Sequence, residues 1–171
     1  LPDGTYLVSH DTGGRTLVHR SADRGTTWRP LAEVRDQKWS TLFLHRGTLH
    51  LIGVAAKSGA MIIRRSTDSG RTWTEPTDAK HGLLAEGKFH CAPTPVVVHA
   101  GRVWRAFEQF SPTPPVRTFR AFMLSAPEDA DLLDAASWTR SNYLTIQRAW
   151  LNTRNEEWLE GNAVVTPAGM I

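Results

Sequence analysis

The chain has 171 residues, and its 20 lysines and arginines against 17 aspartates and glutamates give a formal net charge of +3. The length fits one domain or part of one. A composition of 40% hydrophobic and 22% charged residues is ordinary for a globular protein, which argues against intrinsic disorder. The small charge and the scattered basic residues predict no nucleic-acid partner. The sequence contains no run of about 18 apolar residues, so no membrane span is predicted. Cys91 is the single cysteine, which excludes an internal disulfide.

Glycine turns and strand-like runs alternate along the chain. The turns are expected at 3–4, 46–47, 100–101 and 168–169. Strands are expected, in chain order, at 40–44, 48–54, 61–66 and 72–75, then at 94–99, 102–108, 118–124 and 137–144, and finally at 162–166. Helical periodicity is confined to a short turn at 129–136, and 145–161 is expected to be irregular.

An eight-residue pattern, Ser-x-Asp-x-Gly-x-Thr-Trp, occurs twice, 45 residues apart. Its members are Ser21, Asp23, Gly25 and Trp28 in the first copy, and Ser66, Asp68, Gly70 and Trp73 in the second. The aspartate can accept hydrogen bonds from turn N–H groups, the glycine can adopt a positive φ, and the tryptophan can pack between strands or sheets. We therefore interpret these residues as structural. A degenerate third copy runs from Ser125 to Trp138.

The repeats divide the chain into units of the length that propeller blades have. We expect an all-β fold, a β-propeller of four-stranded antiparallel blades, with about three blades present. The first blade, 1–35, would lack most of its first strand. The second and third blades would occupy 36–80 and 81–150, and 151–171 would begin a fourth. The whole is expected to be part of a longer protein.

The repeated pattern resembles the Asp-boxes, or BNR repeats, of the sialidase (neuraminidase) superfamily. The wider sequence is similar to a group of bacterial sialidase-like proteins in the stretches 39–43, 90–95 and 158–165. The resemblance implies a propeller that is six-bladed when complete. It also implies a ligand site near the propeller axis, at the end opposite the Asp-box turns. The sialidase tyrosine nucleophile and the arginines that bind the substrate carboxylate would lie outside residues 1–171.

Polar residues from distant segments are expected to converge at that end, which we call the mouth. The candidates are His10 and Asp11, Trp39, His90, Glu108, and Glu160 with Asn162. Four of them also have an ordinary interpretation: Asp11 as a turn carboxylate, Glu108 as a solvated strand end, Glu160 as a loop cap, and His90 with Cys91 as a packed segment leading into a strand. No spacing of histidines and cysteines predicts a metal site, and no motif predicts a cofactor.

Carboxylates at such a mouth suit glycoside hydrolysis, in which two of them act on one bond. The resemblance places Asp11 where the sialidase acid/base lies and Glu160 where the tyrosine-activating glutamate lies. We therefore predict a sialidase-like glycosidase acting on a terminal sugar. The alternative is a non-catalytic carbohydrate-binding or interaction propeller. The sequence leaves the oligomeric state and the compartment open, although an extracellular or periplasmic location would fit.

Overall fold

The computed structural model describes residues 1–112, 118–150 and 159–169. The first sheet has the order β1 (Tyr6–Thr12), β2 (Arg15–Ser21), β3 (Arg29–Arg35). The second has the order β4 (Lys38–His45), β5 (Thr48–Val54), β6 (Met61–Ser66), β7 (Leu83–Ala85). The third contains β8 (Phe89–His90), β9 (Val97–His99), β10 (Arg102–Ser111), β11 (Thr118–Pro127) and β12 (Thr139–Arg140). Single 3₁₀ turns occupy Ala135–Ser137 and Arg148–Trp150, and the described residues contain no α-helix.

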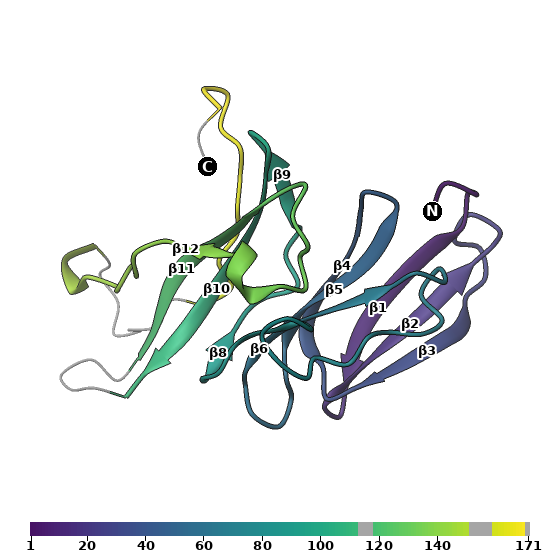
Figure 1. Cartoon of the computed structure of the whole chain (residues 1–171), viewed down its shortest axis with the longest axis horizontal. Coiled ribbons are helices and arrows are strands. Elements are labelled where there is room, and N and C mark those ends of the chain that lie inside the picture. The colour runs from purple at the N-terminus through teal and green to yellow at the C-terminus, as the bar shows by residue number, and fades with distance from the viewer. Residues whose placement is uncertain (113–117, 151–158, 170–171) are drawn as a thin grey trace.

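The three sheets lie side by side in chain order, as Figure 1 shows. Every strand pair is antiparallel. The turns joining β4 to β5 and β9 to β10 place Arg46–Gly47 and Ala100–Gly101 at positive φ, as a two-residue hairpin requires. The molecule is therefore an all-β partial propeller, which confirms the predicted fold class.

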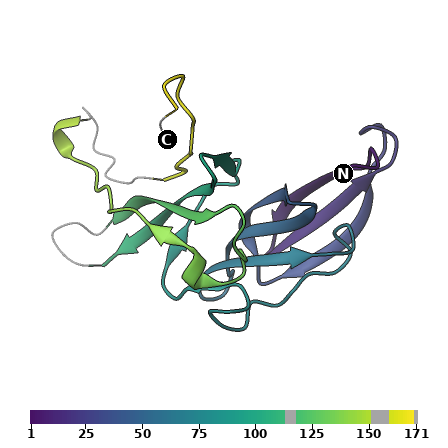
Figure 2. The same ribbon diagram turned by 45° about the horizontal axis from the view of Figure 1, so that its top comes forward.

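Two apolar clusters join the sheets. Val18 and Val34 of the first sheet pack on Leu51 of the second, and all three are buried. Between the second and third sheets, residues such as Ile63 and Phe107 form a larger cluster with no accessible surface on either side chain. Figure 2 gives a second view of this stacking. Hydrophobic burial between faces, and not only hydrogen bonding within sheets, therefore fixes the relative positions of the three sheets.

Both Asp-box turns share three hydrogen bonds to their aspartate. Asp68 Oδ1 accepts from Ser66 Oγ at 2.8 Å and from the Thr72 backbone N–H at 2.9 Å, and Oδ2 accepts from Thr72 Oγ1 at 2.6 Å. Asp23 makes the equivalent bonds to Ser21 and Thr27. Gly25 and Gly70 both have a φ of 90°. In the degenerate third copy, Arg102 donates to Ser125 Oγ instead.

The two box tryptophans differ in their packing. Trp73 packs on the cluster between the first two sheets, and its Nε1 donates to Gly70 O at 3.1 Å. Trp28 is 42% exposed, and its ring lies beside Gly25 of its own turn. The expectation that each tryptophan packs between strands or sheets is therefore wrong for Trp28, because no described element covers its outer face.

Replacing Asp68 with asparagine should weaken the acid dependence of stability. Hydrogen bonds from Thr72 and then from Ser66 lower the pKa of Asp68 from 3.8 to about 2. A carboxyl whose pKa is depressed on folding contributes stability above its unfolded pKa, and this contribution disappears as the pH falls through the folded value. Urea unfolding between pH 5 and pH 2 should thus show a shallower decline for Asp68→Asn. Exposed Asp129→Asn is the control, and identical slopes for both variants would contradict the assignment.

Prolines account for two strand predictions that are wrong. The strand expected at 72–75 is absent, and β7 at Leu83–Ala85 takes its place beside β6. Thr74 makes one backbone bond to Arg65, but Pro76 has no N–H with which to continue a ladder. Likewise, the strand expected at 94–99 is shortened to β9 at Val97–His99, because Pro93 and Pro95 lie in the segment before it, and β8 at Phe89–His90 was not predicted.

Two further strand predictions fail at the end of the chain. The strand expected at 137–144 is reduced to β12 and an isolated bridge between Ala121 and Leu144. Residues 162–166 are not in a strand. Of the segment 151–171 expected to begin a fourth blade, 151–158 and 170–171 lie outside the described residues. The expected helical turn at 129–136 overlaps only the 3₁₀ turn at Ala135–Ser137.

Candidate functional site

Asp11 links the first sheet to the second. It lies near the end of β1, opposite Thr16 of β2, whose Oγ1 donates to Asp11 Oδ1 at 2.6 Å. Its other oxygen, Oδ2, accepts a hydrogen bond from the backbone N–H of Trp39. Trp39 has a φ of 53°, an unfavourable region for a bulky side chain. The carboxylate thus stabilises a strained residue at the beginning of β4.

The Trp39 backbone belongs to an irregularity in the pairing of β4 with β5. Gly53 of β5 leaves room for it, because a Cβ there would lie 2.2 Å from Ser40 Oγ and 2.7 Å from Lys38 O. Beneath it, buried Gln37 donates to Ser40 Oγ at 2.7 Å and accepts from Arg64 Nε at 3.0 Å. Buried hydrogen bonds therefore support the turn that presents the Trp39 ring.

The Trp39 ring meets His90 of the third sheet, with 4.4 Å between ring centroids. His90 Nδ1 lies 3.0 Å from Glu108 Oε2, and the Glu108 side chain is only 1% exposed. Glu108 Oε1 accepts from the backbone N–H of Gly161 at 2.7 Å. The ordinary interpretation of Glu108 as a solvated strand end is therefore wrong, because β8 and residue 161 cover it.

Two buried side chains, Cys91 and Arg105, hold the segment between β8 and β9 in place. Cys91 Sγ donates to Trp39 O at 3.0 Å, and burial raises the pKa of the thiol to about 12, so it stays protonated. Arg105 of β10 has no accessible surface and donates to Thr94 Oγ1 at 2.6 Å and to Ala92 O. Burial lowers the pKa of Arg105 from its usual value. Thr94 in turn donates to Gly161 O at 3.2 Å.

The structure brings together most, but not all, of the predicted site residues. Contacts run without a break from Asp11 through Trp39, His90 and Glu108 to Gly161. Glu160 directly precedes Gly161 in the sequence, with a φ of 64° and an exposed side chain, and Asn162, which follows Gly161, is also exposed. In the described part of the chain, neither side chain has a recorded partner.

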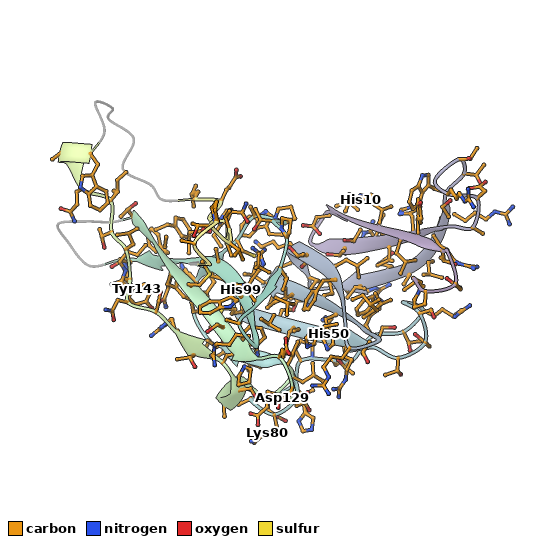
Figure 3. All side chains as sticks on the ribbon, turned by 90° about the horizontal axis from the view of Figure 1, so that it is seen from above. His10, His50, Lys80, His99, Asp129 and Tyr143 are labelled. Atoms are coloured by element: carbon orange, nitrogen blue, oxygen red, sulfur yellow. The ribbon has the colours of Figure 1, made fainter. Side chains whose placement is uncertain are left out.

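His10 is the exception. Its ring stacks on His19 of β2 with 5.1 Å between centroids, and neither ring has a recorded contact with Trp39 or His90. Successive residues of a strand point to opposite faces, so His10 and Asp11 diverge. Figure 3 shows His10 on the opposite side of the molecule from Lys80 and Asp129, with His50 between them.

Sequence reasoning missed several supporting residues. Thr16 could have been inferred from the hairpin register, which places it opposite Asp11. Lys38, whose Nζ lies 4.2 Å from the Trp39 ring centroid, directly precedes a predicted site residue. Arg105 had no signal, because an arginine inside a strand is ordinarily exposed. Groups of three metal-ligating side chains are absent from the described ranges, and no helix in them is long and apolar enough to span a membrane.

The fold recurs among solved structures. The chain is similar to the Penicillium chrysogenum α-L-arabinanase complexed with arabinobiose, with a TM-score of 0.51 and 16% identity over 84% of this chain and 46% of that one. It is also similar to an α-L-arabinofuranosidase from Lactobacillus brevis, with a TM-score of 0.47 and 16% identity over 80% of this chain and 49% of the other. For the Fusarium graminearum GH93 α-L-arabinofuranosidase with arabinobiose, the TM-score is 0.37 and the identity 13%, over 82% and 63% of the two chains.

At this identity, the likeness to the arabinanase shows a shared fold. The chain spans about half the length of the first two of these structures. No family model matches its sequence, and no curated protein matches it. The class defined by fold and geometry is thus a partial β-propeller whose neighbouring sheets are connected through one row of polar and aromatic side chains.

Proposed function

We propose that this protein binds a terminal sugar at the mouth and hydrolyses its glycosidic bond. The observation that supports the proposal is the unbroken row of contacts from Asp11 to Gly161, which joins all three sheets at one place. Side chains in such a row can contact several hydroxyl groups of one ligand at once. Sugar sites combine aromatic rings with charged hydrogen-bonding groups in this way.

The chemistry would use two carboxylates. Asp11 would be the acid/base that exchanges a proton with the glycosidic oxygen, and Glu160 would supply the second carboxylate. Glu160 is exposed and directly precedes Gly161, whose N–H is bound by buried Glu108, so its backbone is fixed while its side chain is free to meet a substrate. Trp39, His90 and Asn162 would contact the sugar. His10 would contribute only at the outer edge of the site.

Two classes of terminal sugar are supported. The Asp-box resemblance favours a sialoside, as in an exo-α-sialidase. The likeness in fold to an arabinanase that binds arabinobiose favours an α-L-arabinofuranoside. These substrates differ in charge, because only the sialoside carries a carboxylate. Lys38, packed over Trp39, is the cation at the mouth that would meet such a group.

A non-catalytic sugar-binding propeller is the second candidate, and one observation favours it. Both oxygens of Asp11 accept hydrogen bonds, from Thr16 Oγ1 and from the Trp39 N–H. A carboxylate used in this way stabilises the turn at Trp39 and is less available for proton transfer. Under this alternative the same mouth binds a glycan, and the Trp39 ring contributes most of the contact.

Turnover assays on the full-length protein distinguish the two functions. The panel would contain 4-nitrophenyl glycosides that include the α-L-arabinofuranoside, together with an aryl α-sialoside. For a glycosidase, Asp11→Asn and Glu160→Gln should each lower turnover at least ~100-fold, as removal of a general acid or base does. Exposed Glu128→Gln should leave turnover unchanged. Full turnover in both site variants would refute the assigned roles, and binding without turnover would favour the second candidate.

A further inference from the structure

The His90 ring is held in one orientation. Trp39 packs against it with 4.4 Å between centroids and Phe119 with 5.8 Å, and Glu108 holds Nδ1 at 3.0 Å. The His90 side chain is 14% exposed, whereas that of Glu108 is 1% exposed. The ring therefore presents its other nitrogen, Nε2, in a fixed direction. Within the described residues, Nε2 has no recorded hydrogen-bond partner.

The surroundings of Glu108 decide which nitrogen carries the proton. Oε1 already accepts from the Gly161 N–H at 2.7 Å, and Oε2 faces His90 Nδ1. An ionised carboxylate can only accept, so Nδ1 must be the donor. In a neutral imidazole the second nitrogen then carries a lone pair and no hydrogen. Glu108 thus makes Nε2 an acceptor.

We propose that His90 Nε2 is the group that recognises one hydroxyl of the bound sugar, and that Glu108 is the positioning residue that fixes this polarity. The inference rests on the proposed function and deepens it, because it specifies that the site recognises one hydroxyl group of the substrate. The sugar must present an O–H donor beside Trp39. An analogue without that hydroxyl would leave a desolvated acceptor unpaired, which is the condition that gives sites strong discrimination.

The first test needs no sugar. Imidazole ¹⁵N NMR of the full-length protein should show His90 in the Nδ1–H tautomer at a pH where the ring is neutral. Glu108→Gln leaves one side-chain oxygen, which can still accept from the Gly161 N–H, and places an NH₂ donor opposite His90 Nδ1. Nδ1 must then accept, so the ring should change to the Nε2–H tautomer. The Nε2–H tautomer in the unmodified protein would overturn the inference. His81, an exposed histidine whose Nδ1 lies 2.8 Å from Asp78, gives the reference signal.

The second test uses methyl α-L-arabinofuranoside, its 2-, 3- and 5-deoxy analogues, and a methyl α-sialoside. One deoxy analogue should bind about 10-fold or more weakly than its parent, the size expected for an unpaired buried acceptor. In His90→Phe, which keeps an aromatic ring beside Trp39, parent and analogue should bind equally. His81→Phe should retain the discrimination.

The outcomes separate the inference from the proposed function. Binding with equal affinity for the parent and every deoxy analogue would overturn the inference while leaving sugar binding intact. Discrimination that survives in His90→Phe would overturn it as well. If neither parent sugar binds, the proposed substrates fail, and the tautomer of His90 alone decides whether Nε2 is the acceptor.

Discussion

Replacing Arg105 with alanine is expected to lower the free energy of unfolding by about 2–4 kcal/mol, because it leaves buried acceptors without donors. Arg105 is fully buried, and its guanidinium bonds Ala92 O and Thr94 Oγ1, which lie between the two short strands β8 and β9. Thr94 contacts Gly161 beside Glu108. Loss of Arg105 should therefore make the segment between β8 and β9 more mobile, as well as lower the stability of the protein.

Part of this loss should be recovered when an uncharged side chain fills the volume that the arginine occupied. Burial lowers the pKa of Arg105, and its Nε has no recorded partner in the described chain, so the charged form is costly. Arg105→Met, which keeps much of the side-chain volume, should consequently be less destabilising than Arg105→Ala. Arg102→Ala, on the same strand but partly exposed, is the control. Urea unfolding measures all three, and an Arg105→Ala protein as stable as Arg102→Ala would contradict the argument.

Phe107→Ala is expected to cost about 3–5 kcal/mol, the range for removing a large aromatic ring from a closed core. Phe107 has no accessible surface and stacks on Phe122, with 6.2 Å between ring centroids. It belongs to the cluster between the second and third sheets. The cavity would lie where those sheets join, so surrounding strands could close it only by moving a whole sheet.

Phe107→Leu provides the matched comparison. Leucine refills most of the volume, and a conservative hydrophobic exchange of this kind usually costs less than about 1.5 kcal/mol. A second comparison is Phe110→Ala on the same strand, where the ring is only half-buried. Equal midpoints for Phe107→Ala and Phe110→Ala in urea unfolding would show that the join between the sheets tolerates a void.

The repeating elements of the fold, namely its hairpin strands and glycine turns, could be predicted from the sequence. Strands at 48–54 and 61–66 agree with β5 and β6, since the first apolar run begins directly after a glycine turn and the second ends at an Asp-box. The glycine turns at 46–47 and 100–101 adopt the positive φ that was expected. Local chemistry determines these features, so a single sequence is enough to predict them.

Features that depend on distant residues were predicted less well. The position of β7 depends on which segment returns to β6 after Pro76, and the sequence near Trp73 does not contain that information. For the site, the residues converging from β1, β4, β8 and β10 could be predicted from blade phasing. The burial of Glu108 could not, because it depends on the pairing of β8 with β10 and on the return of residue 161.

The bond from Asp11 to the Trp39 N–H has a consequence for how the propeller opens. Separation of the first two sheets would break this bond, which supports the left-handed backbone conformation of Trp39 and so the contact of its ring with His90. A ligand that contacts Asp11, Trp39 and His90 would bind residues of all three sheets and oppose their separation. Amide hydrogens in all three should then exchange more slowly together when the mouth is filled, even in strands that the ligand never touches.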